Sequence, residues 1–172
     1  MFLNYIKNFL VKKTLKNSLQ DSKMNHSSGI VQTVGLLVDV TNFSATELLL
    51  AELVANGILE KNIKTILYCD AVKKKQVSEY IIINGAQLKW NGEIRGHEIN
   101  EFSNEKFDLL ISFYDIEKAI LMQITHDSKA QFKVGFSSID KRLNHFIIKT
   151  EINNDAVFVS ELFKYLKLLN KI

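Results

Sequence analysis

The stretch "TVGLLVDVTNFSATELLLAELVANGILEKNIKTILYCD" (residues 33–70) contains two apolar runs separated by a helix-like segment. The runs at 34–39 and 63–69 lack polar alternation, which is typical of parallel strands covered on both faces. Between them, Ser44 begins the capping-box pattern "SATE", and Gly57 is well placed to end the helix. Strand, helix and strand in this order predict a right-handed parallel crossover.

Strands and helices continue to alternate along the rest of the chain. "FDLLISF" and "AQFKVGF" predict two more central strands at 107–113 and 130–136, and a helix closes the chain from residue 155. "VKKKQVSEYIIING" reads as a lysine-faced helix that turns into a strand, and "AQLKWNG" as a third strand closed by a turn at Asn91-Gly92. The pattern predicts one open, mostly parallel, doubly wound (Rossmann-like) α/β sheet with helices on both faces. The four central strands should be parallel and buried on both faces.

Gly135, near the end of the run "KAQFKVGFSS" (129–138), raises the question of a ligand cradle. A glycine inside a strand permits close approach of another segment, but the glycine spacing of a phosphate-binding loop is missing. We therefore interpret this run as a buried strand.

The charge of the chain is concentrated at its N-terminus. Residues 1–23 hold five lysines and one aspartate, a net charge of +4, so the remainder carries −1 of the total of +3. "DSKMNHSSG" is polar and ends in glycine, as linkers do. We predict a basic N-terminal helix at 1–20, a linker at 21–29 and one Rossmann-like domain at 30–172.

Composition limits the cellular context and the chemistry. The single Cys69 excludes an intramolecular disulfide and a cysteine-rich zinc site, and we expect it to be a buried, inert thiol. Lysines interrupt the N-terminal apolar residues and no run reaches membrane-spanning length, so neither a secretory signal nor a transmembrane segment is expected. The four histidines have no metal-like spacing. We predict a cytoplasmic protein with no metal and no cofactor.

Several segments carry a family resemblance. "FDLLISFYDIEKAILMQITHDSKAQFKVGF", "VGLLVD" and "FKYLKLLNKI", together with the basic N-terminal helix, resemble an uncharacterised family of Bacteroidota proteins with the pattern F-D-L-L-I, helix, S-K-A-x-F-(K/R)-V-G. The resemblance covers nearly the whole chain and implies no catalytic residues. "FDLLISF…AQFKVGF" is also similar to the N-terminal domain of family-9, heptosyltransferase-like glycosyltransferases. That similarity concerns the fold, because those enzymes need a second domain for the sugar nucleotide.

Acidic residues stand at three predicted strand ends, Asp39, Asp70 and Asp115. In a parallel sheet these ends share one edge, where ligands bind at the switch in strand order. Such carboxylates can hold Mg²⁺ or can simply cap helices and turns, and we favour capping, above all for Asp115. The first strand–helix loop can bind a small anion but contains no glycine. The candidate ligand-binding residues are Asp39, Thr41, Asn42, Ser44, Asp70 and Asp115.

The N-terminal helix is the strongest functional feature of the sequence. Five apolar side chains, Phe2, Leu3, Ile6, Phe9 and Leu10, fall on one arc of about 120°. Three roles are compatible with this arc: docking onto its own domain, binding an anionic surface (lipid or RNA), or insertion into the groove of a protein partner. Lys7 and Lys12 lie outside the arc, whereas Lys13 and Lys16 lie inside or near it. The candidate partner-binding residues are Phe2, Ile6, Lys7, Phe9, Lys12, Lys13, Lys16 and Trp90.

Trp90 follows a lysine at a predicted turn. It can anchor a partner, stack on a base or sugar, or close the edge of the core, and the last is the commonest role. Our leading hypothesis is a non-catalytic cytoplasmic α/β interaction module attached to a protein complex, RNA, the ribosome or a membrane surface by its basic helix. The alternative is a small-molecule or nucleotide-sugar binding enzyme that uses the strand-end carboxylates.

Overall fold

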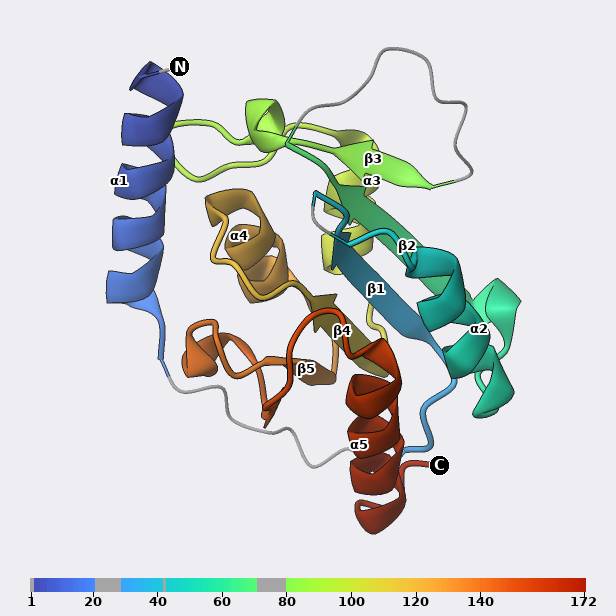
Figure 1. The fold of residues 1–172 in the computed structure, drawn as a ribbon. Coiled ribbons are helices and arrows are strands. Elements are labelled where there is room, and N and C mark those ends of the chain that lie inside the picture. The colour runs from blue at the N-terminus through green and yellow to red at the C-terminus, as the bar shows by residue number, and fades with distance from the viewer. Residues whose placement is uncertain (1, 21–28, 42, 71–79) are drawn as a thin grey trace.

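The computed structural model describes residues 2–20, 29–41, 43–70 and 80–172 (Figure 1). The helices in these ranges are α1 (Phe2–Ser18), α2 (Thr46–Ala55), α3 (His97–Asn104), α4 (Ala119–Asp127) and α5 (Asp155–Leu168). The strands are β1 (Val34–Asp39), β2 (Ile63–Tyr68), β3 (Ile81–Ile83), β4 (Leu109–Phe113), β5 (Phe132–Phe136) and β6 (Phe146–Ile148). Three short 3₁₀ turns are η1 (Glu60–Asn62), η2 (Gly85–Gln87) and η3 (Lys141–Leu143).

All six strands form one parallel sheet in the order β3-β2-β1-β4-β5-β6. The predicted α/β sheet is therefore confirmed, and the four predicted central strands are β1, β2, β4 and β5. Every residue of β1, β4 and β5 is buried. In β2, however, Lys64 is exposed and Ile63 and Leu67 are half-buried, so the prediction of burial on both faces is wrong for this strand. It lies near the edge, where in the described part of the chain its outer neighbour is the three-residue β3.

Helices cover both faces of the sheet. On one face, α2 and α5 pack together over a core that includes Phe113, Phe136 and Phe158, whose rings contact one another. On the other face, α3 and α4 pack over a second core that includes Leu37 and Leu110. None of the helices in the described part of the chain has the length and apolar content needed to cross a bilayer.

Helix α1 forms an additional layer, because it packs against the outer side of α4 (Figure 1). Its buried apolar residues are Val11 and Leu15, and Leu19 follows directly after the helix. Leu15 and Leu19 form a small core with Met122 of α4 and Leu143 of η3. The helix thus docks on its own domain. The side that docks is not the predicted apolar arc of Phe2, Leu3, Ile6, Phe9 and Leu10.

The region before β4 corrects one prediction. "AQLKWNG" is not a strand, since it consists of η2 and a loop in which Leu88 makes one isolated antiparallel bridge to Ile94. The third strand is the preceding Ile81–Ile83. The predicted turn is present, with Gly92 at φ +86° and its N–H bonded to the Lys89 carbonyl. The predicted helix over 71–79 and most of the linker at 21–29 lie outside the described residues.

Two predicted helix caps differ from the structure. Helix α2 begins at Thr46 with Ala45 at the N-cap and no side-chain cap, so Ser44 does not cap it. Helix α4 begins at Ala119 with Lys118 at the N-cap, so Asp115 does not cap it either. Lys118 has an extended backbone (φ −99°, ψ +130°), and Glu117 and Lys118 make the tertiary contacts described below. The predicted stop at Gly57 is confirmed by its φ of +103°.

Gly135 lies under a neighbouring side chain. A Cβ atom at this position would lie 2.5 Å from Nδ2 of Asn144, closer than such atoms can approach. Asn144 is buried, and neither its amide nitrogen nor its amide oxygen has a hydrogen-bond partner among the described residues. The glycine therefore serves close packing within the sheet, as its place in a buried strand predicted.

Candidate functional site

The ends of β1 and β2 meet around the side chain of Lys118. Its ammonium nitrogen lies 2.9 Å from Oδ2 of Asp39, and donates to Oδ2 of Asp70 at 3.0 Å and to Oγ1 of Thr41 at 2.9 Å. A lysine ammonium has three donors, and three protein oxygens surround this one. We call Asp39, Thr41, Tyr68, Asp70 and Lys118 the strand-end cluster.

Tyr68 completes the strand-end cluster. Its hydroxyl donates to Oδ1 of Asp70 at 2.6 Å, and its ring centroid lies 4.5 Å from the Lys118 nitrogen. Partial burial acts to raise the pKa of Asp70, but the hydrogen bonds from Tyr68 and Lys118 outweigh burial and hold this pKa below its usual range. The pKa of Tyr68 is raised well above its usual value, mainly by burial and secondly by the hydrogen bond to Asp70. The cluster is therefore a fixed pair of carboxylates around one lysine, with a protonated phenol beside it.

The strand-end cluster lies where doubly wound sheets bind ligands. Strand β1 is flanked by β2 and β4, and the chain crosses to the β4 side only after β3, so the strand order reverses at β1. Asp39 ends β1 and Lys118 leads from β4 into α4. The cluster thus occupies the topological switch point at the carboxyl edge of the sheet.

The structure brings together three of the six predicted ligand-binding residues, Asp39, Thr41 and Asp70. Asn42 lies outside the described residues. Ser44 is exposed and Asp115 half-buried, and neither contacts Lys118. In the described ranges, no three His, Cys, Asp or Glu side chains gather as a metal site requires.

Lys118 and Tyr68 were missed from the sequence. Lys118 stands in the helix-like run "DIEKAILMQITH" and Tyr68 in a predicted strand, and neither residue was singled out there. A lysine just after the end of a buried strand is the one local signal that could have indicated Lys118, since that position faces the same sheet edge as Asp39 and Asp70.

A cavity of about 270 Å³ lies between the strand-end cluster and α1. One wall comes from α1 and the other from the carboxyl ends of the strands, the η2 turn and the start of α4. Its lining residues are Tyr5, Asn8, Phe9, Lys12, Tyr68, Asp70, Gly85, Glu117, Lys118, Ala119 and Ile120.

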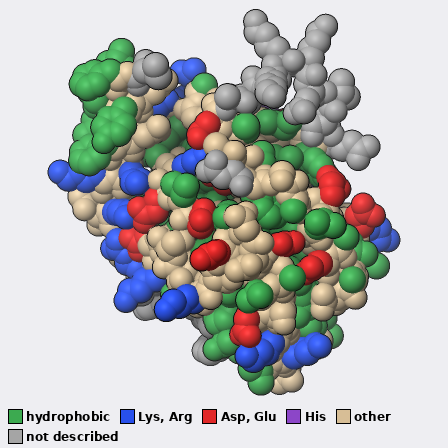
Figure 2. All heavy atoms as spheres, in the orientation of Figure 1, with side chains coloured by type: hydrophobic (Ala, Val, Ile, Leu, Met, Phe, Trp, Pro, Cys, Tyr) green, Lys and Arg blue, Asp and Glu red, His purple; other side chains and the backbone are tan. Residues whose placement is uncertain are grey.

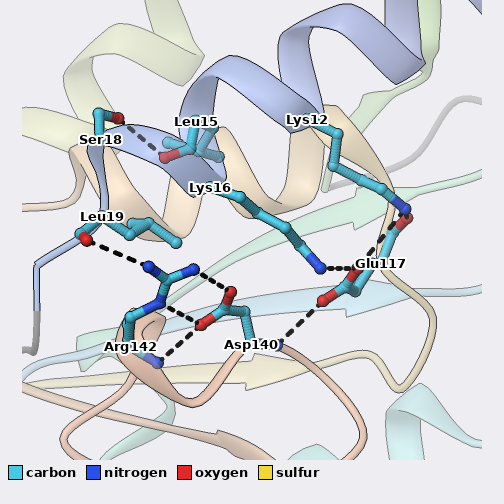
Figure 3. Close-up of polar contacts among 8 residues, drawn as sticks. All are labelled: Lys12, Leu15, Lys16, Ser18, Leu19, Glu117, Asp140 and Arg142. Atoms are coloured by element: carbon cyan, nitrogen blue, oxygen red, sulfur yellow. Dashed lines mark hydrogen bonds and ion pairs between the residues drawn. The ribbon is translucent and has the colours of Figure 1, made fainter.

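Three of the four lysines of α1 bind the chain's own domain. Lys7, only 6% exposed, donates to the Gly85 carbonyl at 3.0 Å. Lys12 donates to the Glu117 carbonyl at 3.1 Å, and Lys16 lies 2.6 Å from Oε2 of Glu117 (Figure 3). At the end of the helix, Arg142 donates to the Leu19 carbonyl at 3.3 Å. These contacts orient α1 with its lysine-bearing side toward the body.

The opposite side of α1 remains exposed. Phe2 is 75% and Phe9 55% exposed, Ile6 is half-buried, and Lys13 is exposed on the same side. We call this surface the outer face of α1. Figure 2 shows it as a hydrophobic patch at the N-terminal end of the helix, with Lys and Arg side chains nearby. Its exposed apolar members are Phe2, Leu3, Tyr5, Phe9 and Leu10; of these, Tyr5 and Phe9 stand at its edge, where they also line the cavity.

Trp90 lies beside α1, apart from the outer face. It is 54% exposed, and it lines a second cavity together with Val11 and Leu15 of the docked side. It therefore neither closes the core completely nor joins the apolar patch.

Family comparison gives the lineage of the chain. The sequence model described as "Family of unknown function (DUF6913)" matches residues 7–169. The chain belongs to this family. The match runs from the docked part of α1 through the sheet to α5, so both the strand-end cluster and the α1–α4 contact lie inside it. No curated protein and no solved structure matches the chain significantly.

Proposed function

We propose that the chain is a non-catalytic α/β module that attaches to an anionic membrane surface through the outer face of α1. One observation carries the proposal: α1 is docked on its own domain, yet its most apolar arc points away from that domain. Docking alone would bury Phe2 and Phe9, whereas the helix buries Lys7 instead. An exposed apolar helix face of this kind is suited to binding another surface.

The distribution of charge supports a membrane surface. Interfacial helices insert an apolar face with Phe and Leu and keep their lysines on the opposite side. Contacts with Gly85 and Glu117 hold Lys7, Lys12 and Lys16 away from the outer face. Lys13 remains on that face near its polar end, where its long stem allows the ammonium to reach lipid headgroups. No acidic residue lies within α1 to oppose an anionic surface.

The same contacts argue against RNA as the principal partner. RNA binding depends on lysines free to neutralise phosphates, and three of the four lysines of α1 are bonded within the chain. A groove on a protein partner would also bind the apolar side chains of α1. It would not account for the absence of carboxylates from this helix, which an anionic membrane surface does. The anionic inner leaflet agrees with the cytoplasmic location that we propose.

Expected contributions to binding are modest but additive. Full burial of one large apolar side chain contributes about 1.5–3 kcal/mol, and each lysine near an anionic surface contributes about 1 kcal/mol. Reversible attachment is therefore expected, weakened by salt through the lysine contribution.

The test is co-sedimentation of the full chain with neutral or phosphatidylserine-containing vesicles. A Leu3→Ser, Leu10→Ser variant removes apolar area from the outer face and should weaken binding at least tenfold. The matched control is Leu48→Ser, Leu168→Ser, which changes two comparably exposed leucines of α2 and α5 on the far side of the sheet. Equal loss in both variants, or no vesicle binding by the unaltered protein, would exclude the membrane. If the protein bound RNA tightly and the Leu3→Ser, Leu10→Ser variant still did so, the partner would be a nucleic acid and not a membrane.

The alternative, a small-molecule or nucleotide-sugar enzyme, rests on the position of Asp39 and Asp70 at the switch point. Both carboxylates are paired with Lys118, so among the described residues of the strand-end cluster the one lysine is already engaged by carboxylates. Thermal-shift assays with nucleotides, sugar nucleotides and divalent ions separate the two hypotheses, because binding to the folded state raises its stability. Stabilisation by a sugar nucleotide would favour the enzyme.

A further inference from the structure

We infer that the cavity between α1 and the strand-end cluster binds a small molecule that presents O–H or N–H donors and one apolar face. The cavity holds about 270 Å³, close to the lower end of the range for small-molecule sites. It lies at the switch point and shares Tyr5 and Phe9 with the edge of the outer face of α1, whereas Leu3 and Leu10 of that face do not line it.

The hydrogen-bonding capacity of the cavity determines the class of ligand. The Lys118 ammonium lies within 3.0 Å of three protein oxygens, and the Lys12 ammonium is directed at Glu117, whose carbonyl lies at 3.1 Å and whose Oε2 lies at 3.5 Å. Asp70, in contrast, accepts one side-chain hydrogen bond at each oxygen, from Tyr68 and from Lys118. Since each carboxylate oxygen can accept two, capacity remains for two donors from a ligand. The side chain of Asp70 is 55% exposed, so this capacity is accessible.

The position of Asp70 is fixed before any ligand arrives. The Tyr68 hydroxyl at 2.6 Å and the Lys118 ammonium at 3.0 Å hold its two oxygens. Its lowered pKa keeps the carboxylate ionised, and therefore acceptor-only, at neutral pH. A preorganised acceptor binds a donor without the entropy cost of ordering its own side chain.

The remaining walls suit an uncharged or aromatic surface. Tyr5 and Phe9 from α1 and Ile120 from α4 line the cavity opposite the carboxylate. The charged lining residues are balanced, since Asp70 and Glu117 face Lys12 and Lys118. Among the described residues this balance gives no net attraction for an anion, and an anionic ligand would also have to displace the carboxylates from the lysines.

Amide chemical-shift changes in ¹H–¹⁵N NMR spectra of the full chain test the inference. 4-Hydroxybenzyl alcohol probes the hydroxyl arm and tyramine the amine arm, while 4-hydroxyphenylacetate keeps the same phenol ring but carries a carboxylate. 4-Hydroxybenzyl alcohol or tyramine should shift the amides of Asp70 and residues 118–120, and 4-hydroxyphenylacetate should not. Equal or larger shifts with 4-hydroxyphenylacetate, or none with either donor probe, would overturn the inference.

Two variants locate the binding. Asn8→Trp places a large ring in the cavity and should abolish the shifts, whereas the matched Asn17→Trp alters an exposed position of α1 outside the cavity and should preserve them. Asp70→Asn keeps the shape of the side chain, removes its charge and should weaken binding about tenfold. Shifts that persist unchanged in both Asn8→Trp and Asp70→Asn would place the probe elsewhere. Vesicle binding uses neither residue, so this inference and the membrane proposal fail separately.

Discussion

Replacing Lys118 with methionine tests whether the strand-end cluster is a stabilising ion pair. Methionine keeps the apolar stem of the side chain but removes the one cation that pairs with the Asp39 carboxylate among the described residues; this carboxylate's side chain is 6% exposed. Removing one partner of a buried pair costs about 3–5 kcal/mol. Asp70 adds little to this loss, because exposed pairs contribute about 0–1 kcal/mol. The expected loss lowers the melting temperature by roughly 6–20 °C for a chain of this length.

The dependence of this loss on pH gives a second readout. The pKa of Asp70 is depressed in the folded protein, so its contribution to stability is present above the unfolded value of about 3.9 and disappears as the pH falls through the folded value. Lys118→Met removes part of that depression. The difference in unfolding free energy between the two proteins should therefore be largest near neutral pH and should narrow as the pH falls below about 4.

Urea denaturation followed by circular dichroism at neutral and acidic pH measures both effects. Lys61→Met, at an exposed position of η1, is the matched control and should change the unfolding free energy by less than about 0.5 kcal/mol. Adding Asp39→Asn to Lys118→Met should recover at least about 1 kcal/mol, because the unpaired buried charge is then gone. A loss from Lys118→Met below about 1 kcal/mol, or a further loss on adding Asp39→Asn, would refute the reasoning.

Three further predictions concern packing and protonation. Gly135→Ala should cost about 1–3 kcal/mol through overpacking against Asn144, and Asn144→Ala in the same chain should recover most of that loss in denaturant titrations. Leu15→Ala should cost about 2–5 kcal/mol if α1 is docked in solution, whereas a loss near zero would show that it is not. Burial lowers the pKa of Lys133 to about 8, so the folded state binds fewer protons than the unfolded chain above this pH. Stability should gain a Lys133 contribution between pH 8 and about 10, and Lys133→Met should lack that gain.

The sheet was predictable because its signal is local. The runs that became β1, β4 and β5 are long and uniformly apolar, and a parallel strand covered on both faces needs nothing else. Strand β3 has only three residues and follows a polar region. Its apolar pattern is therefore no stronger than that of the neighbouring "AQLKWNG", which was predicted as a strand but is not one. A short edge strand is fixed by the strand it pairs with, here β2, whose Ile66 pairs with Ile81.

The orientation of α1 was not predictable from its hydropathy. The docked side contains Lys7, whose stem is buried while its ammonium reaches the Gly85 carbonyl 78 positions away. A scale that treats lysine as polar assigns this side to solvent, although the side chain can bury its methylenes and satisfy its charge at once. The strand-end cluster was likewise only partly predictable. Asp39 and Asp70 were identified from their positions at strand ends, but the position of Lys118 became clear only from the path of the chain between β4 and α4 in the structure.

The contacts of α1 also set an order of events during synthesis. Lys12 and Leu19 bind partners 105 and 123 positions later in the chain. A ribosome adding about 5–20 residues per second takes roughly 6–25 s to make that length. For this interval, Val11 and Leu15 have no surface to dock on, and both sides of the helix are available to a chaperone, a targeting factor or a nearby bilayer. A nascent chain that meets lipid early would then assemble its sheet with the helix already at the membrane.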